Sequence, residues 1–308
     1  MRIVLALLVT VGVSLAADPV RTVLWRDPGK VEALDLYHGP LGRGAIPKPP
    51  FRYVEKNGSG TNEKIIVRDA RGRTWEAKLG PEAKPEAFAT RLAWALGYHS
   101  DRTWLVPEGS IDSRPFRDAR FELRMSGWKY RPDLAWTWKN NPFTGRPELN
   151  GLRILVMLLS DWDNKDPRDI DSNNGVLESP SHRLLVYFVA DWGASLGKWG
   201  NIFTREKWDC EGFTQQSREF VKRNADGTLD WAYRGKHAGD FRKDIRVEDV
   251  RWLMRYLGRL RDQQIRDALR AAGASPQDTG CFTAALRDRI NQLRRVSVAK
   301  GSPAPPRR

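Results

Sequence analysis

Residues 64–97 read KIIVRDARGRTWEAKLGPEAKPEAFATRLAWALG, and this stretch decides the fold. Two runs, 64–68 and 74–79, are rich in β-branched and aromatic residues and are separated by a turn sequence, which predicts a β-hairpin. A helix is predicted over 86–96 because a proline precedes it, apolar residues recur at helical spacing, and Gly97 follows it. The stretch therefore predicts two paired strands followed directly by a helix.

The rest of the chain extends this pattern toward an α+β fold. A further strand is predicted at 103–106, an apolar helix at 150–160 and a buried strand at 184–190. Residues 109–149 are rich in Arg, Trp and Pro with weak periodicity, and we interpret them as an irregular insertion. The last third is predicted to be helical, at 247–257, 261–272 and 283–295. Strands first and helices later predict a two-lobe α+β chain with a small β-rich N-lobe and a mostly helical C-lobe.

The N-terminus has the pattern of a secretory signal. Arg2 supplies a positive start, residues 3–17 carry no charge, and Ser14-Leu15-Ala16 has the small-x-small pattern of a cleavage site. We therefore expect cleavage after Ala16 and a periplasmic or secreted protein. The expected divisions are a signal peptide (1–16), an N-terminal extension (17–50), the N-lobe (51–108), the insertion (109–149), the C-lobe (150–298) and a basic disordered tail (299–308).

The net charge and the cysteine count indicate which partners the chain can bind and whether it contains a disulfide. The net charge of +14 suggests an anionic envelope component or a protein acceptor, yet no nucleic-acid motif is present. No later apolar run is long enough to span a membrane. The chain has two Cys, Cys210 and Cys281, which in an exported protein are expected to form one disulfide, with two buried free thiols as the alternative.

Four polar segments stand in an order that suits phosphoryl transfer. Gly58 and Gly60 precede the first hairpin strand, Lys78 lies on the second, and Glu86 begins the helix. A polar loop with Asp163 follows the apolar helix, and the buried strand ends at Asp191. Phosphoryl transfer needs backbone amides and cations around phosphates, a carboxylate at the attacking hydroxyl, and oxygen ligands for Mg²⁺.

Three stretches contain most of these residues: residues 78–97, the loop at Asp163, and DWGASLG at 191–197. They resemble the atypical kinase superfamily, which includes secretory-pathway casein-kinase-type enzymes, type II phosphatidylinositol kinases and HipA-like kinases. More closely, "KLGPEA", "RLAWALGY" and "DWGASLG" resemble an uncharacterised exported bacterial family with a kinase-like core, over roughly 58–295.

The resemblance implies a role for each matching residue. Lys78 would bind the phosphates of ATP or another nucleotide, together with the glycine loop, and Glu86 would hold Lys78. Asp163 would be the catalytic residue. The metal, Mg²⁺ or Mn²⁺, would be bound by Asp191 and by Asn173 or Asn174. The implied activity is transfer of a phosphoryl group to a protein, lipid or glycan hydroxyl.

Two departures from the superfamily pattern leave alternatives open. Asn164-Lys165 stand where Arg-His is common, and residues 167–171 look inserted, so that Asp166 rivals Asp163 as the catalytic residue. A non-catalytic pseudokinase that binds an anionic envelope component is therefore an alternative. A serine hydrolase is a third, because residues 193–197 match G-x-S-x-G around Ser195.

Overall fold

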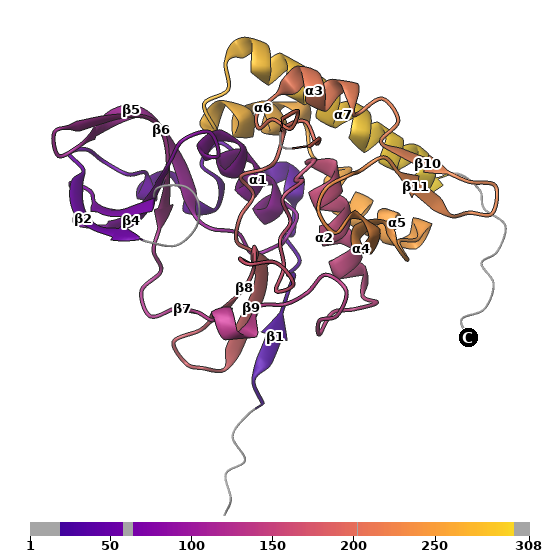
Figure 1. Cartoon of the computed structure of the whole chain (residues 1–308), viewed down its shortest axis with the longest axis horizontal. Coiled ribbons are helices and arrows are strands. Elements are labelled where there is room, and N and C mark those ends of the chain that lie inside the picture. The colour runs from indigo at the N-terminus through magenta and orange to yellow at the C-terminus, as the bar shows by residue number, and fades with distance from the viewer. Residues whose placement is uncertain (1–18, 58–63, 202, 299–308) are drawn as a thin grey trace, which may run out of the picture.

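The computed structural model describes residues 19–57, 64–201 and 203–298. These residues form an α+β fold with seven α-helices and mostly antiparallel sheets, as the sequence predicts at this level. A five-stranded sheet lies at one end of the molecule and most of the helices lie at the other, with a four-stranded sheet below them (Figure 1). The predicted signal and the basic tail lie outside the described residues.

The five-stranded sheet contains the predicted hairpin. Its strands follow the order β2-β3-β4-β6-β5, and every neighbouring pair is antiparallel. Lys78 lies opposite Lys64 across β3 and β4, and opposite Arg120 across β4 and β6. The strand bounds are β2 Arg52–Asn57, β3 Lys64–Arg68, β4 Thr74–Leu79, β5 Thr103–Ile111 and β6 Arg114–Leu123.

The helix α1 (Ala83–Ala95) follows β4 as expected and packs against β5 and β6. It begins three residues before the predicted start at residue 86. Pro85 lies within the first turn, where its missing N–H would have no intrahelical partner in any case. Gly97 ends this region with φ +89°, and a Cβ there would clash with the backbone carbonyl oxygen of Arg26.

The prediction of an irregular insertion over 109–149 was wrong for its first part, whereas residues 124–146 contain only a two-residue strand and a three-residue 3-10 helix. The ten-residue strand β6 lies within it, and β5 runs past Pro107 to Ile111, so the N-lobe boundary at residue 108 falls inside a β-hairpin. Pro107 is tolerated because β5 is an edge strand, where a missing N–H breaks no ladder hydrogen bond. β6 is stabilised by pairing on both sides, which local composition does not reveal.

A second sheet joins distant parts of the chain. Its order is β1-β9-β8-β7, and β1 pairs with β9 in parallel. The N-terminal extension contributes β1 to this sheet, and it contributes Leu24, Val31 and Leu36 to the main core. The strand bounds are β1 Arg21–Val23, β7 Lys129–Tyr130, β8 Asn174–Glu178 and β9 Leu184–Val189, with a separate hairpin of β10 Val221–Arg223 and β11 Leu229–Trp231.

Most of the remaining helices pack around α7. Contacts join α3, α5 and α6 to α7, and α2 to α5. Cys210 and Cys281 form the expected disulfide between α3 and α7, which fits an exported protein. In the part of the chain described, every helix is too short or too polar to span a bilayer. The bounds are α2 Pro147–Leu158, α3 Cys210–Gln215, α4 Ala238–Arg242, α5 Val247–Leu257, α6 Asp262–Ala271 and α7 Pro276–Val298.

Two clusters of buried apolar residues fill the described fold. The larger one joins α1 to the helices, and the smaller one lies in the five-stranded sheet around Phe51, Val67, Trp75 and Phe121. β4 and α1 therefore lie where the two clusters meet, and this position carries Lys78 and Glu86.

Candidate functional site

Lys78 and Glu86 form a buried ion pair. The strand β4 directs Lys78 inward, and the first turn of α1 places Glu86 beside it. Lys78 Nζ donates to Glu86 Oε2 over 3.0 Å, and the two side chains are 2% and 1% exposed. Arg120 Nε lies 3.1 Å from the other Glu86 oxygen. Glu86 is thus held between two cations.

Asp191 reaches the same lysine from a distant part of the chain. It follows β9, and both of its carboxylate oxygens lie 3.3 Å from Lys78 Nζ. Its Oδ1 accepts a hydrogen bond from the Gly193 N–H over 2.8 Å, which fixes the carboxylate. The Asp191 side chain remains 34% exposed, so the cluster opens toward solvent at this residue.

Glu82, which the sequence reasoning missed, completes the cluster. Its Oε2 lies 2.6 Å from Lys78 Nζ, and its Oε1 contacts Lys207. Carboxylate oxygens of Glu82, Glu86 and Asp191 all lie within 4.8 Å of one another. The sequence did contain a signal for this contact. Glu82 follows Lys78 by four residues, and the Gly80-Pro81 turn between them brings the two side chains close together.

The charges in this cluster shift one another's pKa. Burial alone would lower the pKa of Lys78, but the carboxylates of Glu86, Asp191 and Glu82 outweigh it and raise the pKa. Burial raises the pKa of Glu86. For Asp191 and Glu82, burial acts in the same direction but is outweighed mainly by Lys78, so the pKa of each carboxyl is lowered. Lys78 is therefore charged at neutral pH and faces the ionised carboxylates of Glu82 and Asp191.

Asp163 and Asn173 lie together on the polar loop. The Asn173 side-chain amide donates to the Asp163 carbonyl oxygen over 2.7 Å. The Asp163 side chain is 27% exposed and lies 3.5 Å from Lys165 Nζ and 3.9 Å from Lys236 Nζ. Asn174, in contrast, is buried and donates its amide to the Trp136 carbonyl oxygen over 3.0 Å. Asn173 is thus the more accessible of the two.

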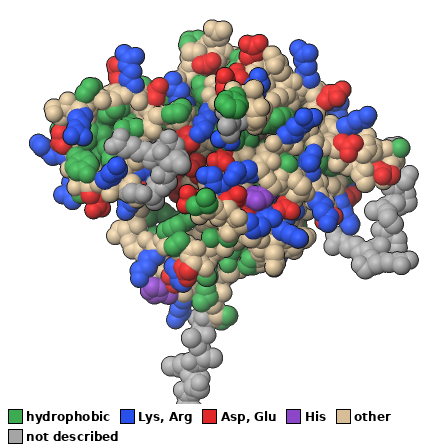
Figure 2. Space-filling model, viewed as in Figure 1, with side chains coloured by type: hydrophobic (Ala, Val, Ile, Leu, Met, Phe, Trp, Pro, Cys, Tyr) green, Lys and Arg blue, Asp and Glu red, His purple; other side chains and the backbone are tan. Residues whose placement is uncertain are grey.

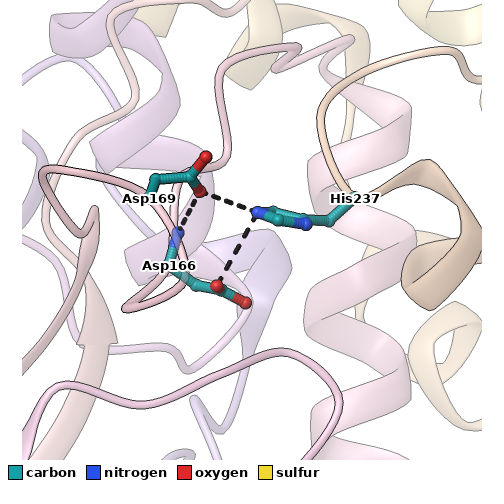
Figure 3. Close-up of side chains that lie close together, drawn as sticks. All are labelled: Asp166, Asp169 and His237. Atoms are coloured by element: carbon teal, nitrogen blue, oxygen red, sulfur yellow. Dashed lines mark hydrogen bonds and ion pairs between the residues drawn. The ribbon is translucent and has the colours of Figure 1, made fainter.

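Asp166, the rival for the catalytic role, belongs to a separate cluster that is already neutralised (Figure 3). It is fully buried, with its carboxylate paired to Arg168 and accepting the Trp138 N–H over 3.1 Å. His237 Nε2 lies 3.7 Å from Asp166 and 2.7 Å from Asp169. Hydrogen bonds, chiefly from His237, outweigh burial and lower the pKa of Asp169 to about 2.

Asp161 is a second acid that the sequence reasoning missed. It is 1% exposed, and neither carboxylate oxygen has a hydrogen-bond partner among the described residues. Burial raises the pKa of the Asp161 carboxyl well above its usual range, and the charges of Asp191 and Asp163 raise it further. Its position two residues before Asp163 was a usable signal.

The donor set fits a hard divalent cation. Carboxylate oxygens are the ligands that Mg²⁺ and Mn²⁺ prefer, and Glu82, Glu86 and Asp191 present them within 4.8 Å of one another. Asp191 is the most exposed of the three side chains, so a cation would reach the cluster at this residue.

The remaining predicted residues are Gly58, Gly60 and Ser195. Gly58 and Gly60 lie outside the described residues, although the flanking strands pair with Asn57 opposite Lys64. Ser195 is fully buried, and its Oγ has no hydrogen-bond partner among the described residues. The chain after it forms a bridge between Lys198 and Glu206 rather than a helix. This is not the strand–turn–helix geometry of a nucleophile elbow.

One face of the molecule carries both signs of charge. Figure 2 shows Lys, Arg, Asp and Glu side chains gathered near the middle of this face, with a His among them. Arg205 lies over the ring of Trp162, 4.6 Å from its centroid, and Lys207 lies 5.7 Å from the same centroid.

No protein-family model matches the chain, and no curated protein matches it either.

Proposed function

We propose that this chain is an exported, kinase-like phosphotransferase that moves a phosphoryl group from ATP or another nucleotide to a hydroxyl acceptor. One observation carries the proposal. Glu86 and Asp191, both chosen from the sequence for this chemistry, contact the same residue, Lys78, although Lys78 and Asp191 are 113 residues apart. The two apolar clusters support a two-lobe arrangement with this site at their junction.

Each residue has a role that its position supports. Glu86 would hold Lys78, which would bind nucleotide phosphates as a fixed cation. Asp163 would accept the proton of the acceptor hydroxyl, because its carboxylate is partly exposed. Asp191 and Asn173 would hold Mg²⁺ or Mn²⁺, which neutralises phosphate charge when bound. Lys165 lies close enough to Asp163 to offset charge on the transferred group.

The acceptor is proposed only by class, as a protein, lipid or glycan hydroxyl outside the cytoplasm. The disulfide supports an oxidising compartment, and the net charge of +14 favours an anionic acceptor. A pseudokinase would use the same surface to bind such a component without transfer.

The test is nucleotide binding by the mature protein. We expect ATP with Mn²⁺ or Mg²⁺ to raise the melting temperature in a concentration-dependent way. The Lys78→Ala and Asp191→Asn variants should lose this shift. The Lys84→Ala variant is the matched control, because Lys84 pairs with Asp118 on the surface, 3.1 Å away. No shift at millimolar ATP would contradict the kinase proposal and favour the pseudokinase.

A further inference from the structure

Lys207 is a second cation in contact with the Lys78 cluster, and the proposed phosphotransfer roles do not use it. Lys207 Nζ contacts Glu82 Oε1, and the other carboxylate oxygen, Glu82 Oε2, lies 2.6 Å from Lys78 Nζ. One carboxylate therefore bridges two ammonium groups. Lys78 lies on β4 and Lys207 lies in the segment before α3, so the two lysines reach Glu82 from distant parts of the chain.

Lys207 is also held against the loop that carries Asp163. Its Nζ lies 5.7 Å from the centroid of the Trp162 ring, and Trp162 directly precedes Asp163. The Trp162 indole N–H donates to the Glu206 carbonyl oxygen over 3.4 Å, which ties the residue before Lys207 to the same loop. Lys207 thus joins the loop of the proposed catalytic residue to the proposed phosphate-binding cluster. The transferred phosphoryl group would pass through this region.

Lys78 has no free position for a phosphate in this arrangement. Its side chain is 2% exposed, and its ammonium group contacts Glu82, Glu86 and Asp191. An ammonium group has three N–H donors, so three carboxylates are enough to satisfy it. A nucleotide phosphate can therefore reach Lys78 only if one of these carboxylates moves away.

Glu82 is the carboxylate best able to move. Glu86 is 1% exposed and lies 3.1 Å from Arg120 Nε, so a second buried cation holds it. Asp191 is fixed by a backbone hydrogen bond and is a proposed metal ligand. Glu82 is held by two lysine side chains, and one of them, Lys207, is 24% exposed. The flexible stem of a lysine can release a carboxylate more readily than a buried arginine or a backbone N–H can.

We propose that Glu82 occupies the place of a nucleotide phosphate in the nucleotide-free protein, and that Lys207 becomes a phosphate-binding residue when the phosphate displaces Glu82. This inference rests on the proposed function and adds Lys207 to the residues that contact the nucleotide. A phosphate presents several anionic oxygens, so it can bridge two ammonium groups as the Glu82 carboxylate does. The phosphate has to compete with Glu82, and this competition lowers the apparent affinity for nucleotide.

The test is a calorimetric titration of the mature protein with ATP and with pyrophosphate, each in the presence of Mg²⁺. We expect Glu82→Gln to bind both ligands about tenfold more tightly, because the amide no longer carries the charge that competes with phosphate. Lys207→Met, which keeps the apolar stem over Trp162, should bind both about tenfold more weakly. The gain from Glu82→Gln should be smaller in a Lys207→Met background, because the two residues act together.

Glu178→Gln and Lys84→Met are the matched controls. The Glu178 side chain is 12% exposed and lies 2.8 Å from Arg131, next to the four-stranded sheet. Lys84 is paired with Asp118 at the surface. Neither pair belongs to the candidate site, so both controls should bind the two ligands as the wild type does. A general effect of net charge would change binding in the controls as much as in the two test variants.

Either of two results would overturn the inference. One is a Glu82→Gln protein that binds no more tightly than the wild type, as expected if Glu82 binds the metal or only braces Lys78. The other is a Lys207→Met protein that binds as tightly as the wild type, and this result decides the question if Glu82→Gln does not fold.

The two ligands separate this inference from the proposed function. If the wild type binds ATP and either of these results is found, only this inference is contradicted. If pyrophosphate binding responds to both variants but ATP does not bind, only the kinase function is contradicted. If neither the wild type nor Glu82→Gln binds either ligand, both proposals are contradicted.

Discussion

Replacing Lys78 by Met should destabilise the protein strongly. The Met side chain keeps most of the apolar stem but removes the ammonium group, which is 2% exposed and contacts three carboxylates within 3.3 Å. Removing one partner of a buried ion pair costs about 3–5 kcal/mol, because the other charge is left uncompensated. Asp191 is 34% exposed and partly screened, so we expect the lower end, about 3 kcal/mol.

The measurement is urea unfolding at pH 7 followed by tryptophan fluorescence. With an m-value of about 3 kcal/mol/M, the midpoint should fall by about 1 M. Lys84→Met is the control, because the Lys84–Asp118 pair is partly exposed at the surface and should contribute no more than about 1 kcal/mol.

The pH dependence gives a second check. The pKa of Glu82 and of Asp191 is lowered in the folded protein, so their ionisation contributes stability above their usual pKa values of 4.5 and 3.8. This contribution is lost as the pH falls through the folded-state pKa. The loss of unfolding free energy in the Lys78→Met variant should therefore have its full value at pH 7 and become smaller below about pH 4. A deficit under about 1 kcal/mol at pH 7, or one that grows on acidification, would refute the reasoning.

Three further outcomes are expected. The double variant Cys210→Ser, Cys281→Ser should lose about 4 kcal/mol in urea unfolding, because the bridge joins residues 71 apart; equal stability of wild type and variant would contradict this. Gly97→Ala should lower the free energy of unfolding, measured by thermal unfolding, by more than about 2 kcal/mol, because φ is +89° and the new Cβ would clash with a backbone carbonyl oxygen. An unchanged melting temperature would show that the backbone relaxes. Asp169→Asn should lower the free energy of unfolding, measured by urea unfolding, by up to about 2 kcal/mol at pH 6, because the pKa of Asp169 is lowered from 3.8 to about 2 in the folded protein. This loss of stability should fade between about pH 4 and pH 2; a loss that persists at pH 2 would mean that ionisation of Asp169 is not its cause.

Local signals in the sequence predicted the elements that position the site. The alternation at 64–68 and 74–79 predicted β3 and β4, and the apolar run at 150–160 predicted α2. The proline and glycine around α1 predicted its place, although not its first residue. These predictions succeeded because turn chemistry and side-chain periodicity act over a few residues.

Long-range pairing was harder to predict. β6 is rich in Arg, and it is stabilised by β4 and β5 on its two sides, so its own composition carried little signal. The same holds for β1, which is paired with a strand about 160 residues away in the sequence. Strand propensity depends on neighbours that the local sequence does not identify.

An α+β chain, its main helices, and residues suited to phosphate chemistry at Lys78, Glu86 and Asp191 could all be predicted from the sequence. The folded chain was needed to show that Glu82, Glu86 and Asp191 all contact Lys78, and that Asp161 is buried with no hydrogen-bond partner among the described residues. Local sequence could not show this, because burial and counter-charge are set by residues far apart in the chain. A carboxylate has the same chemistry in every sequence, and its surroundings decide whether it needs a proton, a lysine or a metal ion.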